Sequence, residues 1–254
     1  MSRFSSQPCG AALIGLALTS LLPLAWAGDF SVNPIRVELG VGARSAAITV
    51  VNEGKEKLSF QLQGMEWTQD AAGADQYKET PDLVFFPKIM SVEAGQEAVI
   101  RLGLKPAAAI SERTFRLFIE ELPGRVTKPE GNVAQVNVLV RFGVPVFAAP
   151  ARPQDALGIE GLELNKGQVS FAARNTGNRH HLFKSVKLEG RDAAGRRVYG
   201  LQIAERYLLA SSVKSFSATL PLEACRQMVR LEVEVQTDKL TETRLLEVSS
   251  PMCP

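Results

Sequence analysis

The sequence predicts an all-β protein built from two antiparallel sandwiches of the immunoglobulin-like kind. Short stretches in which apolar and polar residues alternate with a period of two recur along most of the chain. Turn-forming residues separate these stretches, and no long segment shows the 3.6-residue period of an amphipathic helix. Many short strands at this spacing, with turn signals between them, are typical of antiparallel sandwiches.

Strand patterns occupy most of the first half of the chain. They cover residues 35–39, 46–50, 58–62, 98–102 and 134–147, and turn or loop stretches lie at 52–54, 71–75 and 93–96. The last of these strands begins at Ala134, and Val136, Val138 and Val140 follow at alternate positions. One side of this strand therefore carries a row of small or branched apolar side chains.

A stretch rich in alanine and proline at residues 148–153 interrupts the strands. Proline lacks the backbone N–H that a ladder needs, so this stretch is expected to be a linker. A second set of strands starts near Ile159 and includes residues 169–173, 182–188 and 198–203. We therefore expect an N-terminal domain at residues 28–149 and a C-terminal domain at residues 150–254.

The first residues have the features of a secretory signal peptide. Arg3 is the positive charge of a polar start, an apolar stretch covers residues 11–24, and small residues precede a cleavage site after Ala27. The apolar stretch is shorter than the roughly 20 residues that a membrane-spanning helix needs. We expect residues 1–27 to be removed and the remaining chain to be exported without membrane insertion.

Composition argues against two classes of partner. The formal net charge of the whole chain is +2, and loss of Arg3 with the signal peptide brings it closer to zero. Such a balance indicates neither nucleic-acid binding nor attachment to a membrane surface.

The C-terminal cysteines bracket a predicted hairpin. Alternating strands at residues 228–236 and 241–248 are joined by a turn at 237–240, and Cys225 and Cys253 lie just outside the two strands. Two cysteines in an oxidising compartment allow one intramolecular pairing. We expect a Cys225–Cys253 disulfide that closes the open end of the hairpin; two buried free thiols are the alternative.

Residues for catalysis or metal binding are scarce. The two histidines, His180 and His181, are adjacent, so in a strand they would point to opposite faces. No glycine-rich phosphate loop follows a strand, and the carboxylates alternate with apolar residues as solvent-facing strand positions do. We expect no enzyme activity, no metal and no cofactor.

Several motifs resemble those of the PapD-like periplasmic chaperones of chaperone–usher pili. The resemblance rests on residues 113–123 with their Phe-Ile-Glu-Glu-Leu-Pro ending, the alternating strand 134–147, Asn33-Pro34-Ile35-Arg36-Val37, and Val51-Asn52 at the end of a strand. The Arg-Phe-Gly-Val-Pro-Val-Phe sequence at 141–147 is similar to the archaic, spore-coat-U-associated branch. The resemblance implies two immunoglobulin-like domains set at an angle and a periplasmic location.

The resemblance also implies a mechanism, donor-strand complementation, which is a form of β-augmentation. Pilin subunits of this family lack their last strand, and the chaperone lends a strand and delivers the subunit to an outer-membrane usher. Ala134, Val136, Val138 and Val140 would enter the pilin groove. On the strand pattern alone, these residues would instead pack into their own domain. Free chaperone molecules would be able to self-associate through the same exposed strand.

A basic pair in this family holds the carboxylate at the C-terminus of the pilin. Arg36 matches the first member of that pair, and arginine suits a carboxylate because it can form two charge-assisted hydrogen bonds. The second member departs from the pattern, since Gly143 stands where a lysine is expected. Arg141 lies two residues earlier on the same strand face and is the candidate replacement.

A protein of another class remains as the alternative: an exported two-domain sandwich that acts as an adhesin or a carbohydrate-binding protein. Sugar binding usually uses exposed aromatic faces. The sequence has few tryptophan and tyrosine residues, which weakens this alternative.

Overall fold

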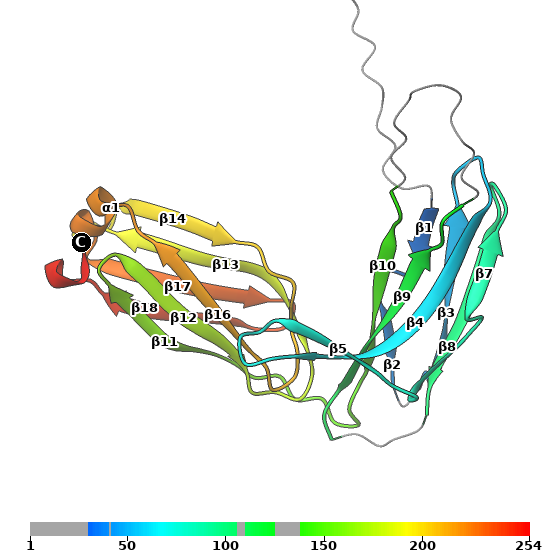
Figure 1. Cartoon of the computed structure of the whole chain (residues 1–254). Coiled ribbons are helices and arrows are strands. Elements are labelled where there is room, and N and C mark those ends of the chain that lie inside the picture. Colours follow the sequence, from blue (N-terminus) through cyan, green and yellow to red (C-terminus); the bar gives the residue numbers. More distant parts are fainter. Residues whose placement is uncertain (1–29, 41, 106–109, 125–137) are drawn as a thin grey trace, which may run out of the picture.

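A computed structural model describes residues 30–40, 42–105, 110–124 and 138–254. Nearly all regular structure in these residues is β-strand, and two sandwiches stand at an angle to each other (Figure 1). The predicted fold class is therefore confirmed. The predicted signal peptide lies outside the described residues, and the domain boundary between residues 149 and 150 stays a prediction.

The N-terminal sandwich consists of two sheets. In the first sheet the order is β1 (Phe30–Asn33), β3 (Ser45–Asn52), β8 (Glu97–Leu104) and β6 (Leu83–Phe86). In the second, here called the β10 sheet, the order is β2 (Val37–Leu39), β10 (Arg141–Ala148), β9 (Arg113–Glu121), β4 (Leu58–Gln69) and β5 (Asp75–Glu79), and β7 (Ile89–Val92) also pairs with β4. Phe60, Ile100 and Phe115 are fully buried in the core between the two sheets.

The first predicted strand, at residues 35–39, is partly wrong. The chain leaves β1 at Asn33, bends through Pro34–Arg36 and enters the other sheet at Val37. Pro34 cannot donate to a ladder, and Ile35 is 64% exposed because it belongs to neither sheet. The prediction was partly wrong because the alternation of apolar and polar residues continues through the bend. Alternation alone does not show where a chain changes sheets.

The predicted strand at residues 134–147 is also shorter in the structure. β10 begins at Arg141, and Val138–Val140 are described but lie outside any strand. Ala134 and Val136 are outside the described residues. Val140 remains tied to the sheet, because its carbonyl accepts a hydrogen bond of 3.0 Å from the backbone N–H of Glu121.

The C-terminal sandwich also has two sheets. One has the order β11 (Leu157–Asn165), β12 (Gln168–Asn175) and β16 (Val213–Thr219). The other has the order β14 (Arg197–Ile203), β13 (His181–Arg191), β17 (Arg230–Thr237) and β18 (Thr241–Glu247), and β15 (Tyr207–Leu208) pairs with β13. Val186, Leu188 and Val233 are fully buried between the sheets.

The predicted hairpin and disulfide are present. Thr237 and Leu240 close the turn between β17 and β18 with a backbone hydrogen bond of 2.8 Å, and Cys225 is bonded to Cys253. Two short helices carry the chain to these cysteines. Cys225 lies in α1 (Leu222–Gln227), and Cys253 follows the 3₁₀ helix Ser250–Met252. The disulfide therefore attaches the end of the chain to the C-terminal sandwich.

We expect replacement of both cysteines, Cys225→Ser with Cys253→Ser, to destabilise the C-terminal sandwich by about 3–4 kcal/mol. The sequence separation is 28, and opening a loop of that length returns chain entropy to the unfolded state. Urea unfolding followed by circular dichroism measures the difference. Unchanged stability of the double variant would contradict a stabilising role.

His181 is a buried titratable group in the C-terminal sandwich. Its side chain lies 3.3 Å from the hydroxyl of Thr237, and its Nε2 atom has no hydrogen-bond partner in the described structure. Burial lowers the pKa of His181, nearby Lys239 lowers it further, and Asp155 and Asp238 oppose the shift. The folded protein therefore resists protonation of this ring.

We expect the stability of the wild-type protein to fall as the pH is lowered from about 7.5 to about 5.5. An unfolded histidine takes up a proton near pH 6.5 whereas folded His181 does not, so acid favours the unfolded state by at most about 1.4 kcal/mol per pH unit. Urea unfolding at both pH values measures this difference, which should be smaller in His181→Gln. An equal or larger difference in the variant would contradict the assignment.

Candidate functional site

Strand β10 has an edge that is only partly paired. β10 pairs with β9 along its whole length, Arg141–Ala148, but β2 joins its other side only at Val146–Ala148. Pro145 immediately precedes the paired stretch and has no backbone N–H to offer β2. Among the residues that the structure describes, the outer edge of β10 from Arg141 to Pro145 has no strand beside it.

The side chains of β10 divide between two faces. Phe142, Val144 and Val146 pack into the core of the N-terminal sandwich. By the same period, Val140 and Val138 continue this row beyond the start of the strand. Val138 is 76% exposed, so its side chain is available to another molecule. Ala134 and Val136, which complete the predicted row, lie outside the described residues.

The opposite face of β10 turns toward the second sandwich. Phe147 on this face is buried in a cluster with Trp67 of β4, Leu209 and Tyr207. The ring of Trp67 meets the ring of Tyr207 edge-on at 5.4 Å. The outer face of the β10 sheet is therefore covered by the C-terminal sandwich at the Phe147 end.

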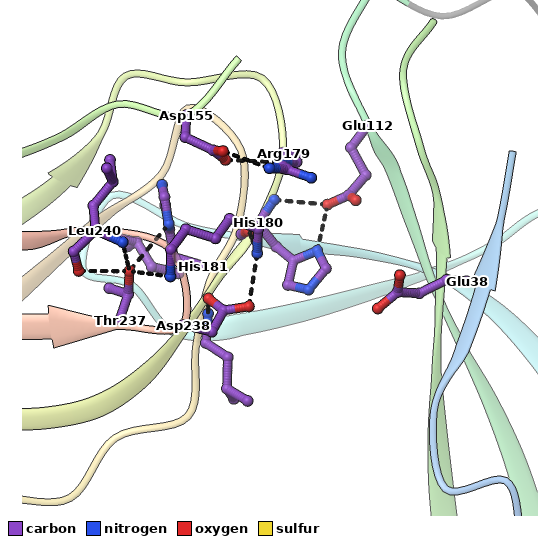
Figure 2. A network of polar contacts seen from close by, with 12 residues as sticks. Glu38, Glu112, Asp155, Arg179, His180, His181, Thr237, Asp238 and Leu240 are labelled. Atoms are coloured by element: carbon purple, nitrogen blue, oxygen red, sulfur yellow. Dashed lines mark hydrogen bonds and ion pairs between the residues drawn. The ribbon is translucent and has the colours of Figure 1, made fainter. Parts of the chain in front are cut away.

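A buried polar contact joins the two sandwiches beside this cluster (Figure 2). The carboxylate of Glu112 accepts a hydrogen bond of 2.8 Å from the backbone N–H of His180 and lies 2.8 Å from its Nδ1. The side chains of Glu112 and His180 are 3% and 5% exposed. The His180 ring stacks on Phe147 with 3.6 Å between ring centroids. These contacts fix where the second sandwich meets β10.

Arg36 lies in the bend just before β2. Its side chain is 39% exposed, and its guanidinium pairs with Glu38 at 3.2 Å. Val37 pairs with Val146, so Arg36 lies immediately before the first paired residue of β2. Glu38 is the register partner of Phe147, which places Arg36 and Glu38 on the outer face of the β10 sheet.

Arg141 lies on the same outer face, at the other end of β10. Its guanidinium stacks 3.9 Å above the ring of Phe118, and it makes long contacts with Glu120 (3.7 Å) and Gln63 (3.4 Å). Its side chain is 49% exposed. The structure thus places the two arginines singled out from the sequence on one face, but at different levels along the sheet.

Arg116 of β9 is a third arginine on this face, and the sequence analysis missed it. It is the register partner of Pro145. Its guanidinium lies 4.0 Å from the centre of the Trp67 ring. Its polar contacts with Gly143 O (3.4 Å) and Asp75 (3.7 Å) are long for a hydrogen bond and an ion pair. The available signal was a basic residue between the buried Phe115 and Leu117, since a charge there must leave the core on the opposite face.

A cavity of about 360 Å³ lies between the sandwiches next to Arg116. Its lining includes Trp67, Asp75, Arg116, Glu205, Tyr207 and Lys214. Lys214 pairs with Glu205 at 3.1 Å and donates to the carbonyl of Gly73 at 3.2 Å. The walls therefore combine aromatic faces with charges of both signs.

Among the described residues, no cluster of three or more histidine, cysteine or acidic side chains could hold a metal ion. Within the same ranges, no helix has the length and apolar character that crossing a membrane would require. His180 and His181 face different surroundings, the domain contact and the C-terminal core, as expected for neighbours in an extended chain.

Comparisons with known proteins identify the N-terminal part of the chain. The family model for the pili and flagellar-assembly chaperones, PapD N-terminal domain, matches residues 29–154. A comparison with curated proteins gives no match.

Solved structures share the two-sandwich fold. A chain in the CsuC–CsuE complex of a chaperone and a tip adhesion subunit, from archaic Csu pili of Acinetobacter baumannii, is 18% identical, with a TM-score of 0.58 over 86% of this chain and 98% of that one. The Salmonella enterica complex of SafA pilin and SafB chaperone gives 15% identity and a TM-score of 0.53, over 87% and 98% of the two chains. The Pseudomonas aeruginosa CupB2 chaperone gives 17% and 0.51, over 84% and 97%.

At these identities the solved structures establish the fold, and the family model establishes the relationship. The similarity to the archaic branch stays a prediction. Residues 29–154 form a PapD-type N-terminal domain, and this part of the chain belongs to the family of pili and flagellar-assembly chaperones.

Proposed function

We propose that this protein is a periplasmic chaperone that binds pilus subunits by donor-strand complementation and delivers them to an outer-membrane usher. The observation that carries the proposal is the edge of β10, which from Arg141 to Pro145 pairs with no strand of the described residues and lies beside an exposed Val138. Two of the matched structures are described as complexes of a chaperone with a pilus subunit. The predicted signal peptide supports the periplasmic location.

Backbone and side chains contribute differently to such a complex. An added strand forms ladder hydrogen bonds with the β10 edge, and these bonds do not depend on the sequence of the partner. Val136, Val138 and Val140, with Ala134, would fill pockets in the pilin. Each valine that becomes fully buried contributes about 1.5–3 kcal/mol, before the cost of ordering the segment is subtracted. No nucleotide or cofactor takes part in this binding.

The carboxylate at the end of the pilin needs a cationic site at the end of the donated strand. Arg36 is half-exposed next to Pro145, and its partner Glu38 lies at the surface, where an ion pair is weak enough to be exchanged for another. Arg141 is the second candidate from the sequence and lies farther along the same face. We propose that Arg36 anchors the carboxylate together with a second arginine on this face, for which Arg141 is the candidate named from the sequence.

We expect Val138→Glu to reduce the amount of co-purified pilin at least tenfold when both proteins are co-expressed in a periplasm. The side chain is solvent-exposed in the free protein, so the variant folds, but in the complex the charge would be buried without a partner. Val229→Glu, at another exposed valine on the C-terminal sandwich, is the matched control. Equal capture by Val138→Glu and the wild type would exclude this strand as the donor.

We expect Arg36→Ala to weaken pilin capture roughly ten- to hundredfold, because a hydrogen bond to a charged group is worth about 1.5–3 kcal/mol. Thermal unfolding should change little, since the Arg36–Glu38 pair lies at the surface. Arg101→Ala, at an exposed arginine of the other sheet, controls for loss of one positive charge. Undiminished capture would remove Arg36 from the anchoring role and leave strand donation intact.

If correctly folded wild-type protein captures none of several candidate pilins, and remains attached to the cell surface instead, the adhesin alternative gains support.

A further inference from the structure

We propose that Arg116 is the guanidinium that completes the carboxylate site with Arg36, in the place that the sequence assigns to Arg141. This inference rests on the proposed function and names the residue that determines how the end of the pilin is held. It follows from the register of the β10 sheet, the absence of a side chain at Gly143, and the unfilled hydrogen-bonding capacity of Arg116.

The register brings Arg36 and Arg116 to neighbouring positions on two sides of β10. Arg36 immediately precedes Val37, whose partner on β10 is Val146, and Arg116 is the register partner of Pro145 on the β9 side. About two strand spacings, or about 10 Å, separate strands β2 and β9 across β10. We infer that a carboxylate between the two arginines would be within reach of both.

Arg141 is farther from this position. It precedes Pro145 by four residues on β10, which places it about 13 Å away along the strand. Its guanidinium already stacks on Phe118 and contacts Glu120 and Gln63. Arg141, the partner that the sequence suggests for Arg36, therefore lies farther along the sheet than Arg116 does.

Gly143 makes room for Arg116. A Cβ atom at this position would lie 3.1 Å from Cδ of Arg116 and 3.1 Å from the ring of Phe118, closer than ordinary van der Waals contact. A side chain at residue 143 would therefore require Arg116 or Phe118 to shift by a few tenths of an ångström. The missing lysine and the arginine on the next strand are alternative ways to place a positive charge above the same region of the sheet.

Arg116 is held in position without having its hydrogen bonds satisfied. Packing against Trp67 leaves its side chain 14% exposed. Its Nε–H has no hydrogen-bond partner in the described structure, and its polar contacts with Gly143 O and Asp75 are long, at 3.4 and 3.7 Å. A guanidinium has five N–H donors, so most of its capacity remains for an acceptor such as a carboxylate.

The charges around the neighbouring cavity favour an anion. Asp75 and Glu205 supply two negative charges, whereas Arg116, Arg206 and Lys214 supply three positive charges. The charged groups lining this cavity therefore carry an excess of one positive charge beside Arg116, although Arg36 and Pro145 are not among the lining residues. The aromatic faces of Trp67 and Tyr207 exclude water from one side of Arg116, which strengthens the interaction of its charge with an anion.

The test uses a pilin that the wild-type protein captures, both in its native form and with a Gly-Ser extension at its C-terminus. The extension moves the carboxylate by about 7 Å. Urea-denatured pilin is diluted into a concentration series of purified chaperone, and the concentration that gives half-maximal soluble complex is measured. With native pilin, Arg116→Gln should raise this concentration roughly ten- to hundredfold. With extended pilin, wild type and Arg116→Gln should give the same, already raised, value.

Two further variants separate binding from a structural role. Gly143→Ala keeps every charge but crowds the side chain of Arg116 by a few tenths of an ångström, so we expect it to weaken capture of native pilin modestly, and more than capture of extended pilin. Arg101→Gln controls for loss of charge outside the site. A non-additive result between the Arg116 and pilin changes is the signature of direct contact, since independent effects multiply.

Four outcomes would overturn the proposal. They are an unchanged value for Arg116→Gln, an equal loss with both pilins, a carboxylate-dependent loss in Arg141→Gln but not in Arg116→Gln, and equal capture of native and extended pilin by the wild type. The last outcome removes the carboxylate site but leaves strand donation intact. Loss of capture in Val138→Glu identifies strand donation separately, so the two proposals fail in distinguishable ways.

Discussion

The incomplete pairing of β10 is the feature around which the β10 sheet and the domain contact are arranged. This strand is held by β9 along its whole length, but β2 reaches only its last three residues, Val146–Ala148. Pro145, without an N–H, stands where the second ladder ends. The even-numbered side chains of β10 enter the core, and Phe147 on the other face enters the domain contact. At the C-terminal end of β10, one face is therefore covered by the core and the other by the second sandwich. Among the described residues, the backbone edge of its first half is left without a neighbouring strand.

The domain contact is formed at the opposite end of the same strand. Glu112 is almost completely buried, and such a carboxylate is tolerated because the backbone N–H and ring of His180 lie within hydrogen-bonding distance. Stacking of His180 on Phe147 adds a contact with a defined geometry. The second sandwich is thus fixed against the strand whose other end is free. A partner strand at that free end would lie beside the surface that the two sandwiches share.

The arginines show how a sheet brings charges that are distant in the sequence near one another. Arg36 and Arg116 are 80 positions apart, yet Arg116 is the register partner of Pro145, and Arg36 immediately precedes Val37, which pairs with Val146, the residue after Pro145. Arg141 is much nearer to Pro145 in the sequence but lies farther along the strand. Successive residues along a strand are more than about 3 Å apart, whereas neighbouring strands lie within about 5 Å of each other. Two residues on adjacent strands can therefore be closer than two residues a few positions apart on one strand.

The all-β class, the two-sandwich architecture, the β17–β18 hairpin and the Cys225–Cys253 pairing could be predicted from the sequence. These features depend on local periodicity, on turn residues and on the small number of cysteines, all of which are readable along the chain. The change of sheet at Pro34–Arg36, the place of Val138–Val140 outside the strand, and the position of Arg116 beside Gly143 became visible in the folded chain alone. Alternation shows which face a side chain occupies, but the rung opposite it is set by pairing between strands that are distant in sequence.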